Sequence, residues 1–268
     1  MSALRVPLRT VIDLRRLDTS KISREEKTTT PRIVRINLVP WTVGVSLFLR
    51  LPVHKSVPAL FDSRRVGILR NCVLENVRLE KMYRLILKQK TAICSALRAI
   101  AKAYDSGEGP VLVHCVHGKD RTGLVVGLVL LLCDVPEVIV IKDYAASGPA
   151  LLLAKKDGQI SKDSPMWLDN RYLVTPAIAM ASLLAWLRKK YKAKTSNEAA
   201  EAYVRAAGLS GKDIASIRTA LLSTMKKSSL PSHHVVDTAA TGSPSETCVE
   251  ATMGVRAASR ATKVPDSD

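Results

Sequence analysis

The chain has 268 residues, of which 47% are hydrophobic and 4% aromatic, and its formal net charge is +17. This hydrophobic content supports a packed core and excludes a chain that is disordered or fibrous over most of its length. The scarcity of aromatic side chains disfavours a base-stacking surface for single-stranded nucleic acid. The positive charge favours an anionic partner: a phosphorylated substrate, an acidic membrane surface or nucleic acid.

The positive charge belongs to residues 1–226, because residues 227–268 contain four basic and five acidic side chains. An ordinary solvated surface would explain this charge equally well. The five cysteines, at positions 72, 94, 115, 133 and 248, show no zinc-binding spacing, so they predict reduced thiols, a cytoplasmic setting and no metal. The N-terminus shows no signal peptide, and the longest apolar run, 123–133, is too short to cross a bilayer.

The first half of the chain alternates between strand and helix patterns. Residues 8–14 are rich in β-branched side chains and residues 32–39 alternate apolar with polar, so both segments predict strands, with Asp13 at the end of the first. Residues 79–104 have the periodicity of one helix. The apolar run 111–115 predicts a strand that is buried on both faces of a central sheet.

The second half of the chain is predicted to be helical. The expected helices cover 122–133, Pro136 to Ala146, 175–192, 196–207 and 211–226, and Gly208 and Gly211 separate the last two. Together these elements predict an α/β fold with a central, mostly parallel sheet flanked by helices and with a helical C-terminal part. The domain is expected to span 1–226, with a mobile cap at 40–80 and a disordered tail at 227–268.

The most informative stretch reads Cys115-Val116-His117-Gly118-Lys119-Asp120-Arg121 and lies between a predicted strand and a predicted helix. A strand, a tight glycine-containing loop and a helix direct several backbone N–H groups into one concavity, which binds phosphate-like anions. A cysteine in such a field is available as a nucleophilic thiolate. Arg121, six positions after Cys115, can grip two oxygens of the bound phosphate. This stretch therefore predicts phosphoryl transfer to sulfur.

Neighbouring residues acquire roles in this chemistry. Gly118 permits the tight loop, Lys119 can neutralise a phosphate oxygen or an adjacent phosphate, and Thr122 could donate its hydroxyl to the thiolate. The departing oxygen needs a proton, for which Asp120 is the nearest candidate acid and Asp13 the second. The residues expected to contact the substrate are His114, Val116, His117, Gly118, Lys119, Thr122 and Asp13.

Asp120 and Asp13 could each have a structural role instead of a catalytic one. Asp120 could instead only orient Arg121 or the start of the following helix. Asp13 could form a structural ion pair with Arg15 at the strand end.

The Cys-x5-Arg pattern is the signature loop of the cysteine-dependent protein tyrosine phosphatases. Its extended form HCxxGKDRTG, at 114–123, resembles an atypical group of these enzymes that includes a secreted mycobacterial tyrosine phosphatase and a listerial tyrosine and lipid phosphatase. The similarity extends beyond the loop, to Asp13-Leu14-Arg15, to Glu137, Ile139, Asp143 and Tyr144, and to YVRAAGLS at 203–210.

This resemblance implies the tyrosine phosphatase fold, with Cys115 as nucleophile, Arg121 as phosphate clamp, Asp120 as general acid and Lys119 as a substrate-binding cation. It implies hydrolysis of phosphotyrosine, in some members also of phosphoserine, phosphothreonine or phosphoinositides, without metal or cofactor. A lysine in the loop is the feature associated with inositol lipids. Two departures concern the loop: Val116 stands where a second lysine would be, and His117 where a small residue is commoner.

An Arg-Asp-Leu-Gly-Gly-like stretch that usually precedes the Asp-Leu-Arg strand is also absent, so part of the family domain is expected to be missing. Basic and apolar residues within 40–80 would suit a peripheral contact with an anionic membrane.

Three other functions compete with a phosphatase. A pseudophosphatase would bind phosphorylated partners without turnover, although Cys115, Asp120 and Arg121 are all present. A rhodanese-like sulfurtransferase also begins its loop with cysteine, but the continuation Lys-Asp-Arg-Thr-Gly argues against it. Binding of nucleic acid by the basic surface is the least favoured, and no nucleic-acid partner is expected.

Overall fold

The computed structural model describes residues 8–15, 31–40, 43, 45, 46, 49, 78–160, 170 and 173–228, with side chains as far as 222. The predicted cap at 40–80 lies outside the described residues except at a few positions. The predicted tail also lies outside them, apart from its first two residues, which are helical.

Within the described residues, three short parallel strands form the sheet: β1 (Thr10–Asp13), β2 (Arg32–Arg35) and β3 (Val111–His114), in the order β2-β1-β3. Asp13 ends β1, as predicted, and stands opposite His114 in the ladder with β3. The Leu14 backbone N–H donates to the His114 carbonyl at 2.9 Å, so the pairing continues beyond the strands. The α/β architecture with a parallel sheet, predicted from the sequence, is confirmed.

The strand that is buried on both faces is β1, and not β3 as predicted. All four residues of β1 are buried; β1 lies between the other two strands, and helix α5 packs against it. In β3, Val111 and Val113 are buried, whereas Leu112 and His114 are partly exposed. The apolar run of 111–115 thus reflects the approach of one helix layer rather than a central position in the sheet.

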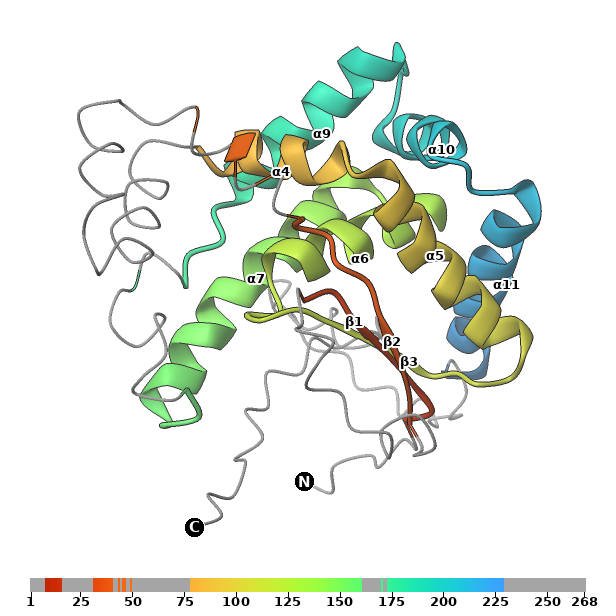
Figure 1. Cartoon of the computed structure of the whole chain (residues 1–268), viewed down its shortest axis with the longest axis horizontal. Helices are drawn as coiled ribbons and strands as arrows, with labels where there is room; N and C mark the ends of the chain where they lie inside the picture. The colour runs from red at the N-terminus through yellow and green to blue at the C-terminus, as the bar shows by residue number, and fades with distance from the viewer. Residues whose placement is uncertain are drawn as a thin grey trace, which may run out of the picture.

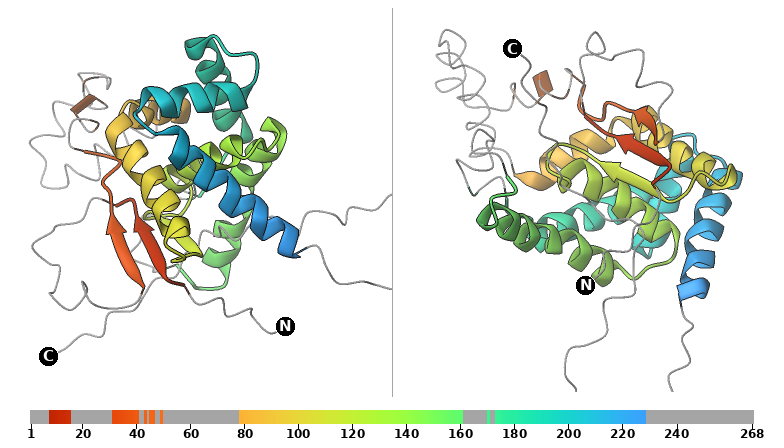
Figure 2. Two further views of the ribbon diagram at one scale, coloured as in Figure 1. Left: turned by 90° about the vertical axis from the view of Figure 1, so that its right-hand side faces the viewer. Right: turned by 90° about the horizontal axis from the view of Figure 1, so that it is seen from below.

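The helices in the described part are α4 (Leu79–Leu87), α5 (Lys90–Asp105), α6 (Asp120–Leu132), α7 (Glu137–Lys156), α9 (Ala177–Tyr191), α10 (Ser196–Ala206) and α11 (Gly211–Ser228). Figure 1 shows α6 among the other helices and next to the sheet, and Figure 2 shows the sheet on one side of the molecule. Helix α6 is buried over most of its circumference, because it contacts β3 and helices α4, α5, α7, α10 and α11. None of the described helices is long and apolar enough to span a membrane.

The single helix predicted for 79–104 is in fact two helices. Gln89 has a ψ of 57°, which lies outside the helical region and separates α4 from α5. Helix α4 then packs against α6 and α9, while α5 packs against β1 and α11. The sequence contains no proline or glycine at this point to indicate the break.

Helix α7 extends ten residues beyond its predicted end at Ala146 and passes through Pro149. Proline has no N–H, so it cannot donate to the carbonyl four residues earlier, that of Ala145. The hydroxyl of Thr175 donates to this carbonyl instead, at 2.9 Å. Gly148 makes room for this contact, since a Cβ there would lie 2.7 Å from the Thr175 hydroxyl. The helix therefore continues because a distant residue replaces the lost hydrogen bond.

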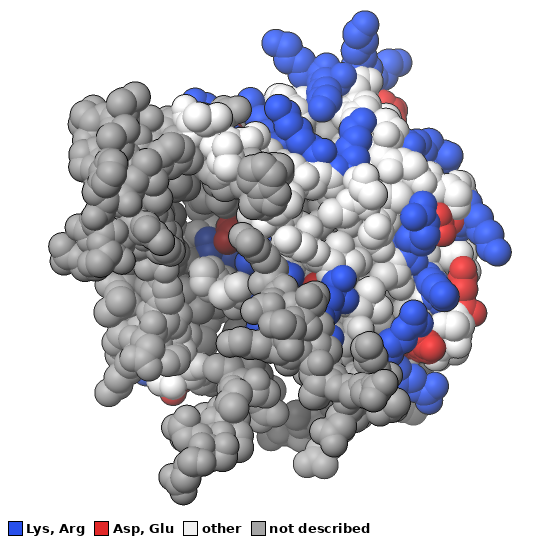
Figure 3. All heavy atoms as spheres, in the orientation of Figure 1, with Lys and Arg blue, Asp and Glu red and all other residues white. Residues whose placement is uncertain are grey.

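The distribution of charge on the described surface is broad. Figure 3 shows Lys and Arg side chains spread over much of the described surface in this view, with fewer Asp and Glu. This spread is typical of a solvated basic surface.

The central position of β1 leads to a prediction for Ile12, which is fully buried. Ile12→Ala should lower the free energy of unfolding by about 2–5 kcal/mol, because the sheet cannot close around the lost methyl groups. The control Leu153→Ala, at a side chain that is 59% exposed, should change it by less than about 0.5 kcal/mol. Urea unfolding measures both values, and equal effects would contradict the assignment of β1 to the core.

Candidate active site

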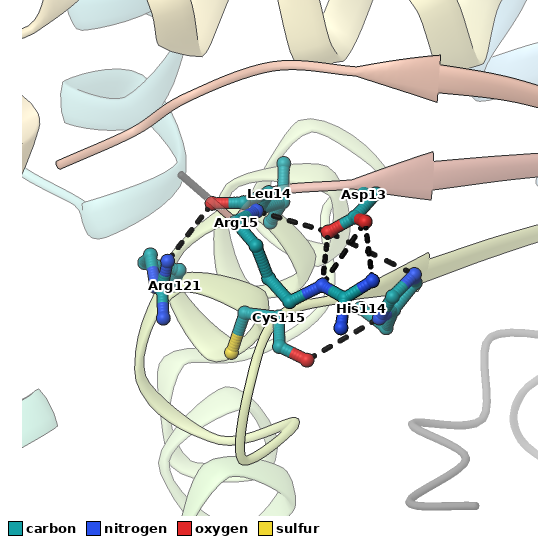
Figure 4. Close-up of polar contacts among 6 residues, drawn as sticks. All are labelled: Asp13, Leu14, Arg15, His114, Cys115 and Arg121. Atoms are coloured by element: carbon teal, nitrogen blue, oxygen red, sulfur yellow. Dashed lines mark hydrogen bonds and ion pairs between the residues drawn. The ribbon is translucent and has the colours of Figure 1, made fainter. Parts of the chain in front are cut away.

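The cysteine of the loop directly follows β3. Because β1 and β3 run parallel, their carboxyl ends meet at one edge of the sheet, which brings residues 13–15 beside His114 and Cys115. Figure 4 shows the Cys115 thiol on the side that faces Arg121, and the Cys115 carbonyl on the side that faces His114. Cys115 is only 6% exposed.

The loop turns back through Gly118, whose φ of +67° is a conformation that side chains with a Cβ rarely adopt. Helix α6 then begins at Asp120, two residues earlier than predicted, and the Gly123 N–H donates to the Lys119 carbonyl at 2.7 Å. Asp120 and Arg121 therefore stand in the first turn of α6. The first turn of a helix has unpaired N–H groups and a partial positive charge, which favour an anion.

Arg121 is anchored to the neighbouring strand end. Its Nη1 donates to the Leu14 carbonyl at 3.0 Å, as Figure 4 shows. In the same view the Arg121 side chain lies on the side of the Cys115 thiol. The structure thus brings together the nucleophile and the phosphate clamp that the sequence predicts.

Asp13 and Arg15 form a two-pronged ion pair. Arg15 Nε lies 2.9 and 3.0 Å from the two carboxylate oxygens of Asp13, and Nη2 lies 2.8 Å from Oδ2. Burial raises the pKa of Asp13, but the hydrogen bonds from Arg15 outweigh burial and hold this pKa below its ordinary value. The same bonds raise the pKa of Arg15, and the charge of Cys115 adds to this effect. Arg15 is therefore a fixed cation within electrostatic reach of Cys115.

His114 lies between this ion pair and the loop. Its Nδ1 is 3.2 Å from the Cys115 carbonyl oxygen and its Nε2 is 3.9 Å from Asp13 Oδ1. Through these contacts His114 links the start of the loop to the end of β1.

Asp120 accepts two hydrogen bonds on the same oxygen. The Tyr83 hydroxyl donates to Oδ1 at 2.6 Å, and Lys119 Nζ lies 3.1 Å from it. A second tyrosine, Tyr144, has its hydroxyl 2.6 Å from that of Tyr83. Lys119 also donates to the Val174 carbonyl at 3.3 Å and is only 4% exposed.

The other predicted substrate contacts differ in exposure. Val116 is 57% exposed, whereas His117 is half-buried. The Thr122 hydroxyl is buried and has no hydrogen-bond partner within the described part of the chain. The predicted hydrogen bond from Thr122 to the Cys115 thiol is therefore not formed here.

Arg15 and Tyr83 are not among the site residues that the sequence predicts. The sequence could indicate Arg15, because a cation two residues after a strand-end carboxylate reaches the same sheet edge. Nothing local distinguishes Tyr83, an apolar-face residue of an amphipathic helix that lies 37 positions before Asp120.

The two other described cysteines, Cys94 and Cys133, are free thiols away from this loop. Burial raises the pKa of both, to about 11 for Cys133. In the part of the chain that the structure covers, no group of three His, Cys, Asp or Glu side chains is placed to hold a metal ion.

Comparison with known proteins matches residues 2–223 to the tyrosine phosphatase family. A curated tyrosine-protein phosphatase of Nostoc commune is 43% identical over 56 residues, which make up 21% of this chain. The match spans 19% of that relative, about a fifth of its length.

The Asp13–Arg15 pair predicts a specific pH dependence of stability. A carboxyl whose pKa is lowered by folding stabilises the native state above its unfolded value, near 3.8, and loses this contribution as the pH falls through the lowered value. Urea unfolding of the wild type and Asp13→Asn should therefore differ most at neutral pH and converge below about pH 3.8. A difference that stays constant with pH would exclude this contribution.

Proposed function

This chain belongs to the tyrosine phosphatase family, and we propose that it hydrolyses phosphomonoesters through a phosphocysteine formed on Cys115. The observation that carries the proposal is the placement of the Cys115 thiol, at the start of the loop, on the side of Arg121, in the first turn of α6, with Arg121 bonded to the Leu14 carbonyl. A nucleophile beneath a forked cation is the arrangement that an in-line attack on a phosphate requires.

In the first step, the Cys115 thiolate attacks phosphorus, the S–P bond forms and the bond from phosphorus to the ester oxygen breaks. Arg121 and the start of α6 balance the charge on the phosphoryl oxygens. Asp120 gives its proton to the departing oxygen, which leaves as an alcohol or phenol. Asp13 is less suited to this role, because both of its carboxylate oxygens accept hydrogen bonds from Arg15.

In the second step, water attacks the phosphorus, the S–P bond breaks and the thiolate is restored. Asp120, now ionised, takes the proton of the attacking water, and inorganic phosphate leaves. Arginine and helix dipole supply the positive charge throughout, so we propose that neither a metal nor a cofactor takes part.

We propose phosphotyrosine in proteins or the phosphate groups of phosphoinositides as substrates, with phosphoserine and phosphothreonine as further candidates. The exposed Val116 would contact the part of the substrate outside the phosphate, and His117, Gly118 and Thr122 would line the phosphate pocket. The free thiols of Cys94 and Cys133 fit a reducing compartment such as the cytoplasm. The basic surface fits a peripheral contact with anionic lipid.

Phosphate release tests this function. With EDTA present, the protein should release phosphate from at least one member of a panel of phosphotyrosine, phosphoserine and phosphothreonine peptides and mono- and polyphosphorylated phosphoinositides. Cys115→Ser should abolish release but retain binding of inorganic phosphate, measured by calorimetry, because Arg121 is unchanged. Residual turnover by Cys115→Ser, or dependence on a divalent cation, would exclude the proposed route. Phosphate binding without any release by the wild type would instead indicate a pseudophosphatase.

The role of Asp120 has a separate test. Asp120→Ala should slow hydrolysis of an alkyl phosphate by about 10²–10⁴-fold, because the departing alkoxide needs a proton. It should slow p-nitrophenyl phosphate far less, since nitrophenolate leaves without one. Steady-state rates of both substrates measure the difference, and equal losses would move the acid role to another residue such as Asp13.

A further inference from the structure

Side chains from three parts of the chain meet at Asp120. Tyr83 comes from α4, Tyr144 from α7 and Lys119 from the loop. The proton of the Tyr83 hydroxyl is directed to Asp120 Oδ1, so the Tyr144 hydroxyl must donate to the oxygen of Tyr83. We call these three side chains, Tyr83, Tyr144 and Lys119, the Asp120 clamp.

The clamp is buried and closely packed. Tyr83 is fully buried, and Tyr144 and Lys119 are 2% and 4% exposed. The two tyrosine rings meet edge to face, with centroids 6.1 Å apart. Gly123 in α6 makes room for the second ring, because a Cβ at this position would lie 3.0 Å from Tyr144 Cδ2. The hydroxyl groups are therefore fixed by packing as well as by hydrogen bonds.

The two direct hydrogen bonds of the clamp end on one oxygen of Asp120. Tyr83 and Lys119 both donate to Oδ1, and in the described part of the chain Oδ2 accepts no hydrogen bond. The Asp120 side chain is 19% exposed, so it still reaches solvent. An acid that must deliver a proton needs one oxygen fixed and the other directed at the substrate. Oδ2 is the oxygen that remains for this purpose.

Lys119 is held from two sides. Its second acceptor, the Val174 carbonyl, belongs to a segment that is docked on α7 through the Thr175 hydroxyl. Helix α7 therefore supplies Tyr144 and also supports the carbonyl that holds Lys119. A buried ammonium with a carboxylate and a carbonyl as acceptors has little capacity left for a second phosphate group.

We propose that Tyr83, Tyr144 and Lys119 are positioning residues, which fix Oδ1 of Asp120 so that Oδ2 carries the proton to the departing oxygen. Lys119 then acts through Asp120 and does not bind a second phosphate of the substrate. This inference rests on the proposed function. The Asp120 clamp then serves the protonation of the leaving group and not the binding of phosphate.

The kinetic test compares Tyr83→Phe, Tyr144→Phe and Lys119→Met with Tyr203→Phe. Tyr203 is a matched control, because its buried hydroxyl donates to the carbonyl of Leu87 at the end of the same helix α4, at 2.8 Å. Tyr83→Phe and Lys119→Met should lower kcat for phenyl phosphate at least about tenfold with little change in KM. Both should lower kcat for p-nitrophenyl phosphate far less. Tyr144→Phe should show a weaker form of the same pattern, and Tyr203→Phe should leave kcat for both substrates unchanged.

Two kinetic results would overturn the proposal. Equal losses on both substrates in Tyr83→Phe would mean that the hydroxyl only supports the fold. A rise in KM for bisphosphorylated over monophosphorylated inositol phosphates in Lys119→Met would mean that Lys119 binds substrate directly.

A test without turnover separates this inference from the proposed function. Urea unfolding of Tyr83→Phe, Asp120→Ala and the double variant should show non-additive destabilisation, because each single change removes the one hydrogen bond that the two side chains share. The cycle of Tyr203→Phe with Asp120→Ala should be additive. Additivity in both cycles would overturn the clamp. If the Tyr83–Asp120 cycle is non-additive but the wild type releases no phosphate, the clamp is supported and the proposed function is rejected.

Discussion

The parallel pairing of β1 with β3, with Asp13 opposite His114, is the constraint on which the site depends. It places the backbone of Leu14 beside the loop, although Leu14 and Arg121 are 107 positions apart in the chain. A shift of one residue in this register would turn the Asp13 side chain to the other face of the sheet. The carboxylate that holds Arg15 near Cys115 would then be lost from the site.

The acid side of the site has a separate support. Cys115 and Arg121 rest on the sheet edge, whereas Asp120 is held by side chains from α4 and α7. The start of α6 joins these two halves, because Asp120 and Arg121 are consecutive residues that project in different directions from one helical turn. The geometry of the first turn of α6 therefore sets how Asp120, the proposed acid, lies relative to Arg121, the proposed phosphate ligand.

The parts of the site that are local in sequence could be predicted from the sequence. Cys115, Gly118 and Arg121 lie within seven consecutive residues, whose order of residue types predicts the proposed chemistry, and Asp13 is recognisable as a strand end. The parallel α/β architecture followed from the alternation of strand and helix patterns. The break between α4 and α5 at Gln89 could not be predicted in this way, because no proline or glycine indicates it and only tertiary packing decides it.

Contacts between distant segments explain what the sequence could not indicate. Tyr83 has the pattern of an ordinary core residue, and only the meeting of α4 with α6 brings its hydroxyl to Asp120. Pro149 should end a helix, yet α7 continues because Thr175 replaces the missing donor. In both cases a single side chain from another element decides the local outcome.

The hydrogen bond from Thr175 to α7 also has a consequence for local opening. Proteins open in cooperative units with different free energies, and a helix that contains proline has one backbone hydrogen bond fewer to resist opening. Opening of α7 around Ala145 and Pro149 would release Thr175, and with it the Val174 carbonyl that holds Lys119. The sheet edge under Cys115 would be unaffected. Amide hydrogen exchange should therefore divide the site into a slowly exchanging sheet edge with Cys115 and a more rapidly opening unit that holds Lys119.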